Sequence, residues 1–291
     1  MALNPWPGLL MEAIDRTGSA ACVGLDPVAS RMPDAIRQRH RTDPVDAIGA
    51  FGIEIVRAVA GVVPVVKLQS ACYERFGSAG VRVMERTAAA AREAGLLVLL
   101  DAKRGDIGIS AQHYAAAGVA LGADAITVSP YLGTETLEPY VDAGLGMYAL
   151  VRTSNPGSGE LQSLAMEDGQ TVAERVARTL ASFGGGHTPT PGGLSAVGAV
   201  VGATKASELA GFRELMPDQP VLVPGVGAQG GTVADCRALR RASATGLADA
   251  GVLITASRSV IYAEAATGES WLEAVRRAAG ELSAETASVL G

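Results

Sequence analysis

Short apolar stretches alternate with longer amphipathic stretches along the 291 residues of this chain. The short stretches are rich in Val, Leu and Ile and almost continuously hydrophobic, as is typical of parallel strands that are buried on both faces. The pattern predicts eight strands, at residues 19–26, 62–69, 96–103, 123–130, 146–153, 196–203, 220–227 and 250–257.

The stretches between and after these strands have the spacing of amphipathic helices, and several have Gly or Pro at their ends. Helices are expected at residues 43–60, 78–94, 110–121, 134–143, 170–182, 205–216, 232–241 and 270–288. Eight strand-then-helix units favour an α/β fold of the (β/α)8 TIM barrel type, as a single domain over residues 1–291. A doubly wound open sheet is less favoured, because no G-x-G-x-x-G motif follows the first strand.

Two segments interrupt this rhythm. The Gly-, Pro- and Thr-rich segment "FGGGHTPTPGGLS", residues 183–195, is predicted to be a mobile surface loop. Residues 152–169 form a long connection after the fifth strand, where loops of a barrel tend to bind ligands. Trp6 and Trp271 are expected to pack against the outside of the barrel.

The composition indicates a folded protein of a reducing compartment. Hydrophobic residues make up 48% and charged residues 19% of the chain, which favours a large core over disorder. The formal net charge is -6 and Lys and Arg do not cluster, so nucleic acid is not an expected partner. Cys22, Cys72 and Cys236 lie far apart, which argues against disulfides or structural zinc. No signal peptide or membrane span is expected, and the predicted location is the cytoplasm.

Polar residues gather where the predicted strands end. The third strand, in "LLVLLDAKRGDIG" (residues 96–108), runs from apolar residues directly into Asp101 and Lys103. The other strand ends carry Asp26, Lys67, residues 152–155, Gln229, and Ser257 with Arg258. In a barrel these carboxyl ends converge on one mouth, where active sites are found.

The D-x-K-x-x-D sequence at the third strand suggests acid–base chemistry. Asp101 and Lys103 are two residues apart and face the same side of a strand, while Asp106 lies beyond its end. Together with Lys67 they give alternating charges, which keep Lys103 protonated and able to protonate a carbanion. The alternative is a structural network of ion pairs, because such networks also perturb pKa values.

The last two strand ends suggest a phosphate site. "PGVGAQGG" and "SRS" each stand before a predicted helix, and backbone N–H groups there can bind a phosphate together with Arg258. The loops after strands seven and eight are the usual phosphate site of TIM barrels. The alternative is that these glycines only make tight turns.

Taken together, "PVVKLQSACYERFG", "LLDAKRGDIG", "LVRTSNPG", "PGVGAQGG" and "ASRSVIYA" resemble the longer bacterial-type orotidine 5'-phosphate decarboxylases, in the family's order, over residues 24–262. The resemblance implies a (β/α)8 homodimer, a lyase that converts orotidine 5'-phosphate to uridine 5'-phosphate in pyrimidine biosynthesis. It implies no metal and no organic cofactor.

The resemblance also implies residue roles. Lys103 resembles the proton donor to C6 of the pyrimidine, Asp101 the carboxylate beside the substrate carboxylate, and Lys67 the lysine that links the aspartates. Asp106 resembles the aspartate that crosses the dimer interface into the partner's site. The implied substrate-binding residues are Asp26, Ile107, Ser110, Ser154, Pro224, Gln229, Ser257 and Arg258. One departure is "DIGIS" where many relatives have "DIPNT", which places Gly108 and Ile109 in the loop that meets the partner's substrate.

Three other functions are consistent with parts of this sequence pattern. A metal-dependent decarboxylase of a sugar-acid phosphate shares the D-x-K-x-x-D sequence but needs a further acidic residue at a strand end. A Schiff-base aldolase needs a lysine of low pKa, which flanking aspartates oppose. A nucleotide-binding module without catalysis would not need Lys103.

Overall fold

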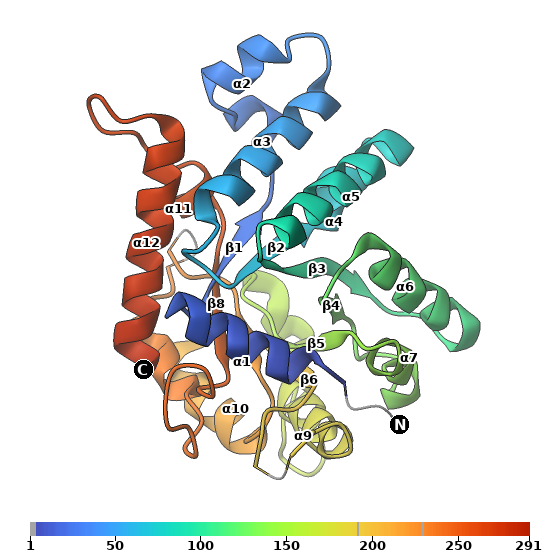
Figure 1. The fold of residues 1–291 in the computed structure, drawn as a ribbon. Coiled ribbons are helices and arrows are strands. Elements are labelled where there is room, and N and C mark those ends of the chain that lie inside the picture. Colours follow the sequence, from blue (N-terminus) through green and yellow to red (C-terminus); the bar gives the residue numbers. More distant parts are fainter. Residues whose placement is uncertain (1–3, 191, 228–229) are drawn as a thin grey trace.

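A closed barrel of eight parallel strands, in the order of the chain, forms the centre of the molecule. The computed structural model describes residues 4–190, 192–227 and 230–291 (Figure 1). The strands are β1 (Ala21–Leu25), β2 (Val65–Gln69), β3 (Leu97–Arg104), β4 (Ala125–Val128), β5 (Gly146–Arg152), β6 (Val197–Val201), β7 (Val221–Val223) and β8 (Val252–Ala256). Because β8 pairs with β1, the predicted TIM barrel is confirmed.

Helices surround the strands in Figure 1. The α-helices are α1 (Trp6–Thr17), α2 (Asp34–Arg39), α3 (Pro44–Val59), α4 (Ser70–Glu74), α5 (Gly77–Glu93), α6 (Gly108–Leu121), α7 (Glu138–Asp142), α8 (Gly159–Gln162), α9 (Val172–Gly185), α10 (Leu209–Leu215), α11 (Arg258–Ile261) and α12 (Trp271–Leu290). The short 3-10 helices are η1 (Ala29–Arg31), η2 (Thr134–Thr136), η3 (Pro156–Ser158), η4 (Ala203–Glu208) and η5 (Ala234–Leu239).

Three predicted helices are less regular than the sequence pattern indicates. The stretches 134–143 and 205–216 each form a 3-10 turn followed by a short α-helix, and the stretch 232–241 forms only η5. Pro139 explains the first case, because it has no N–H and therefore occupies the start of α7 instead of continuing the preceding turn. In the second case Lys205 has non-helical backbone angles inside η4.

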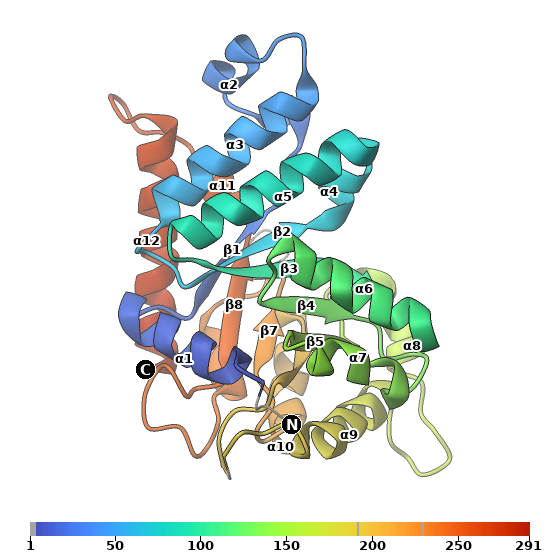
Figure 2. The same cartoon turned by 45° about the vertical axis from the view of Figure 1, so that its right-hand side comes forward.

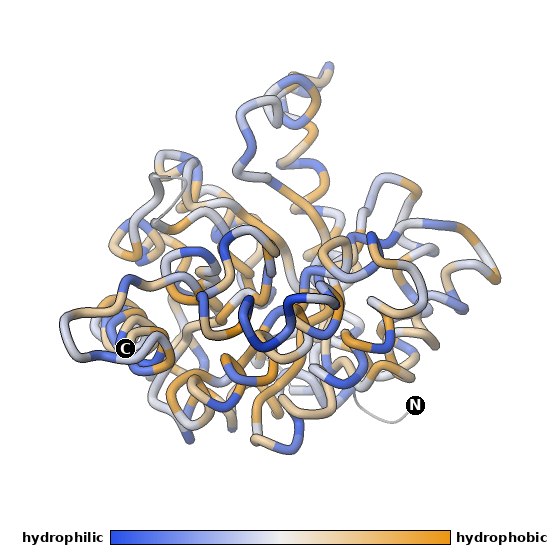
Figure 3. The backbone as a smooth tube through the Cα atoms, turned by 90° about the horizontal axis from the view of Figure 1, so that it is seen from above, coloured by the Kyte–Doolittle hydropathy of each residue, from blue (hydrophilic) through white to orange (hydrophobic). Residues whose placement is uncertain are grey.

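The hydrophobic core lies mainly between the strands and the helices. The outward-facing residues of the strands pack against apolar faces of the helices, and the alternation of hydrophobic and hydrophilic residues along the helices can be followed in Figure 3. Side-chain caps define several helix starts, with Asp43 before α3 and capping boxes at Thr171 with Glu174 and at Ser270 with Glu273.

A second apolar cluster fills the amino-terminal end of the barrel. It joins α1 to inward-facing strand residues, namely Trp6, Leu10 and Ile14 with Cys22, Val65, Leu99, Ala125, Tyr148, Val200, Leu222 and Leu253. Trp6 is 0% exposed and meets the ring of Tyr148 edge-on at 6.0 Å. The expectation that Trp6 packs on the barrel exterior was therefore wrong, because α1 turns this residue into the barrel end. Trp271 does pack outside, stacked on Phe51 of α3.

The two irregular segments have partly regular structure. Helix α9 continues to Gly185, so the predicted loop 183–195 begins later than expected. Its far end returns to this helix, where the Ser195 hydroxyl donates to the Gly184 carbonyl at 2.9 Å. Residue 191 lies outside the described residues, and the mobility of the loop stays a prediction. The connection 152–169 contains η3 and α8. Within the described ranges, no helix is long and apolar enough to cross a membrane.

Candidate active site

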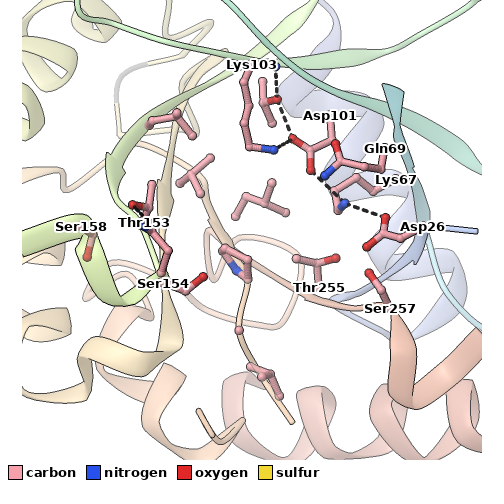
Figure 4. Close-up of a pocket in the computed structure, with 18 of the residues that line it drawn as sticks. Asp26, Lys67, Gln69, Asp101, Lys103, Thr153, Ser154, Ser158, Thr255 and Ser257 are labelled. Carbon is pink, nitrogen blue, oxygen red and sulfur yellow. Dashed lines mark hydrogen bonds and ion pairs between the residues drawn. The ribbon is translucent and has the colours of Figure 1, made fainter. Parts of the chain in front are cut away.

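A cavity of about 630 Å³ opens at the carboxyl ends of the strands. This volume lies within the usual range for small-molecule sites. Eight of the predicted site residues line the cavity, namely Asp26, Lys67, Asp101, Lys103, Ser154, Pro224, Ser257 and Arg258. Figure 4 shows Asp26, Lys67, Asp101 and Lys103 on one wall, with Thr153, Ser154 and Ser158 across the cavity from them. The structure thus brings these eight residues together at one mouth, while their roles stay predictions.

Four charged side chains on that wall form a continuous chain of ion pairs. The Lys67 ammonium donates to Asp101 Oδ2 at 2.9 Å and to Asp26 Oδ1 at 3.4 Å. The Lys103 ammonium donates to the other oxygen of Asp101, Oδ1, at 2.5 Å (Figure 4). Positive and negative charges therefore alternate from β1 to β3, in the order Asp26, Lys67, Asp101, Lys103.

Burial and pairing act against each other on the pKa values of this chain. Burial alone would lower the pKa of Lys67, but the charges of Asp101 and Asp26 outweigh burial and raise that pKa above its ordinary value. Burial would likewise raise the pKa of Asp101, but Lys67 and Lys103 hold it well below its ordinary value. Both groups of the central pair are therefore charged at neutral pH.

Lys103 lies in an irregular part of β3. The pairing of β3 with β4 shifts between Leu100 and Arg104, and Lys103 has a φ of 48°. The sequence predicted a regular strand that places Asp101 and Lys103 on one side. Both side chains do reach the same cavity, but Lys103 does so from a left-handed backbone conformation that is rare for residues other than Gly.

Three predicted residues do not line the cavity of their own chain. Asp106, Ile107 and Ser110 lie beyond the end of β3, where the Asp106 carboxylate accepts from the Ile107 N–H at 2.8 Å and the Ile107 side chain is 63% exposed. Gly108 follows with a φ of 52°, which a proline cannot adopt. The backbone at Gly108 therefore could not accommodate the proline that many relatives have at this position.

Two glycines make room for serines of the site. A Cβ on Gly24 of β1 would lie 2.0 Å from Ser257 Oγ. A Cβ on Gly202, after β6, would lie 2.8 Å from Ser154 Cβ. Larger residues at these two positions would displace the serines that the resemblance assigns to substrate.

Arg152 holds the opposite wall in place and does not reach the cavity. Its buried guanidinium donates to the Glu208 carboxylate at 2.7 and 3.1 Å and to the Ser158 hydroxyl at 2.9 Å. Of the polar run 152–155, only Thr153, Ser154 and Asn155 line the cavity. Arg152 thus fixes the segment that presents them.

The structure adds residues that the sequence analysis missed. Further lining residues include Gln69, Thr127, Leu150, Val200, Leu222 and Thr255. In the sequence, these residues are marked only by their position in a strand, where every second residue points into the barrel. Gln229 lies outside the described residues. Within the described ranges, no three His, Cys, Asp or Glu side chains are grouped so that they could hold a metal ion.

The chain is similar to known decarboxylases over most of its length. Residues 21–273 match the model of the orotidine 5'-phosphate decarboxylase / HUMPS family. Orotidine 5'-phosphate decarboxylase of Rhodopirellula baltica is 40% identical, with 92% of this chain and 94% of the relative covered. The enzyme of the same name from Roseiflexus castenholzii is 42% identical, with 92% of each covered.

The fold agrees with this similarity. The structure of Leishmania donovani OMP decarboxylase matches with a TM-score of 0.76 and 31% sequence identity, and the match covers 98% of each chain. Since the family match spans well over half of the chain and ends beyond β8, it includes every strand end that lines the cavity. The chain belongs to the orotidine 5'-phosphate decarboxylase / HUMPS family.

Proposed function

We propose that this protein decarboxylates orotidine 5'-phosphate to uridine 5'-phosphate without a cofactor, and that Lys103 supplies the proton. The observation that carries the proposal is the chain of alternating charges that ends in Lys103 at the cavity. The relatives at about 40% identity are named for this activity, which supports the choice within the family.

The chemistry requires a fixed positive charge near C6 of the pyrimidine. Loss of CO₂ leaves a carbanion there, and the Lys103 ammonium stabilises it before transferring a proton. Preorganised charges of this kind are often the largest single contribution to catalysis. Asp101, held ionised by two lysines, lies beside the substrate carboxylate, and two like charges 4 Å apart repel by about 4 kcal/mol at an effective dielectric constant near 20.

Contacts far from the reacting carbon must hold the substrate against this repulsion. We assign the phosphate to Arg258, Ser257 and Pro224 and, from the resemblance alone, to Gln229. Ser154, on the opposite wall, reads the amide edge of the pyrimidine. Asp26 and Lys67 bind the ribose. Ser154 lies across the cavity from Asp26, Lys67 and Ser257, which supports this orientation (Figure 4).

The two enzymatic rivals fit the site less well. On the β2 side of the cavity, Gln69 stands near Lys67 where a metal-dependent decarboxylase would need another carboxylate. A Schiff-base aldolase needs a neutral amine, whereas the carboxylates around Lys67 raise its pKa.

We further propose that the enzyme is a homodimer in which Asp106, with Ile107 and Ser110, serves the partner's site. The exclusion of these residues from their own cavity supports this arrangement. Exposed apolar side chains occur at the start of α6 and along it, at the side of the barrel in Figure 2, and in the segment after β4, namely Ile107, Ile109, Tyr114, Val119, Tyr131 and Leu132. Such a patch is typical of an interface.

The proposed location is the cytoplasm. Cys22, Cys72 and Cys236 are all free, and none is near another in sequence. Unpaired, scattered cysteines are compatible with a reducing compartment.

A direct assay tests the proposed reaction. We expect purified protein to consume orotidine 5'-phosphate at the same rate with and without EDTA. The reaction is monitored by the loss of pyrimidine absorbance. Lys103→Ala should lower kcat by on the order of 10³-fold or more, because the stabilising charge and the proton are both lost. The variant should still bind uridine 5'-phosphate. No turnover by the wild-type protein would refute the activity, and a rate lost to EDTA would favour the metal-dependent rival.

Removal of the Arg258 guanidinium should weaken the phosphate contact. We expect Arg258→Ala to raise KM about 10- to 100-fold, as for one charged hydrogen bond of about 1.5–3 kcal/mol. The control is Arg178→Ala, which removes an exposed arginine from α9. Equal KM values for the two variants would show that the phosphate binds in another part of the cavity.

Mixing two inactive variants tests the shared site. Random exchange between Lys103→Ala and Asp106→Ala subunits should restore up to about a quarter of wild-type activity, since half of the dimers then contain one intact site of two. Activity is measured after proven subunit exchange. A mixture that stays inactive would contradict the sharing of Asp106.

The lowered pKa of Asp101 makes stability depend on pH. Ionised Asp101 stabilises the fold above its ordinary pKa of 3.8, and this contribution is lost as the pH falls toward the lower pKa of the folded state. The difference in unfolding free energy between wild type and Asp101→Asn should therefore be constant near neutral pH. It should shrink by about 1.4 kcal/mol per pH unit below the ordinary value. Urea titrations at about pH 6 and about pH 3 measure it, and equal differences would argue against the depressed pKa.

A further inference from the structure

One buried hydroxyl connects Asp101 and Lys103 of β3. Thr127, in β4, is 1% exposed. Its Oγ1 accepts from the backbone N–H of Lys103 at 3.0 Å. The same Oγ1 donates to Asp101 Oδ1 at 2.8 Å. This carboxylate oxygen is the one that also accepts from the Lys103 ammonium.

The chemistry of the partners fixes the direction of both hydrogen bonds. A backbone N–H can only donate, and an ionised carboxylate can only accept. A hydroxyl can do both at once, so it is suited to lie between them. Valine has the same shape as threonine and can do neither, which would leave the Lys103 N–H without this partner inside the barrel.

The hydrogen bond to Lys103 falls at the irregular part of β3. Between the pairs Leu100–Ile126 and Arg104–Val128, β3 advances four residues while β4 advances two. The surplus forms a bulge, and within the described ranges Lys103 is the only residue other than Gly with a positive φ. Such a conformation persists only where surrounding contacts hold it.

We propose that Thr127 is a positioning residue for the decarboxylation. Its single hydroxyl holds the backbone of Lys103 in the left-handed conformation and orients the Asp101 carboxylate, so that the ammonium points into the cavity at a fixed place. The inference rests on the proposed role of Lys103. The hydroxyl gives its one proton to Asp101 and accepts from the Lys103 N–H, and Thr127 is almost fully buried, so we assign it a role through these two residues.

The test compares Thr127→Val with Thr127→Ser. We expect Thr127→Val to lower kcat about 10- to 100-fold, as small displacements of reacting groups do, with KM changed less than about threefold. Thr127→Ser keeps the hydroxyl and should restore most of kcat. If Thr127→Val does not fold, Thr127→Ala takes its place in the comparison.

Thr286→Val is the matched control. Thr286 is also buried, and its hydroxyl also accepts from a backbone N–H, that of Ala20 at 3.2 Å, while donating to the Ser283 carbonyl at 2.8 Å. It lies on α12, outside the cavity. The Tm of this variant should fall about as much as that of Thr127→Val, while its kcat should stay at the wild-type value.

The outcomes separate this inference from the proposed function. An active wild-type enzyme whose Thr127→Val variant keeps its kcat, or loses kcat without rescue by Thr127→Ser, would overturn the role of Thr127 alone. A change confined to KM would also overturn it. Lack of activity in the wild-type enzyme would instead refute the proposed function.

Discussion

The buried ion pair between Lys67 and Asp101 is the interaction on which the rest of the site depends. Its two charges are largely removed from water, which is costly unless each charge finds good partners. Asp101 therefore also accepts from Lys103 and Thr127, and Lys67 also donates to Asp26. Removing one member would leave another charge buried and unpaired, so the wall has to be built as a unit.

The closed barrel supplies the geometry that this unit needs. Lys67, Asp101 and Asp26 come from three adjacent parallel strands, whose carboxyl ends meet at one edge. Trp6 fills the opposite end of the barrel, which leaves the interior packed below the charges. Strand positions are rigid, so the ammonium groups are oriented before any substrate arrives, as electrostatic catalysis requires.

The other parts of the cavity are arranged around this fixed wall. Arg152 and Glu208 hold the facing segment, and the glycines at 24 and 202 let the serines of the site approach. The end of β3 directs two charged side chains to different places. Lys103 turns inward through a bulge, whereas Asp106 does not line the cavity of its own chain.

The sequence by itself determined the barrel and most of the charged wall. Eight short apolar strands alternating with helices favour a barrel, and the spacing of D-x-K-x-x-D brings two carboxylates and a lysine together locally. The tertiary structure alone decided the bulge at Lys103, the inward position of Trp6 and the contact of Thr127, which lies 24 residues from Lys103. In the sequence, a threonine inside an apolar strand indicates no more than the usual preference of threonine for strands. Its partner depends on the register between two strands, and that register follows from packing over the whole barrel and not from any local pattern.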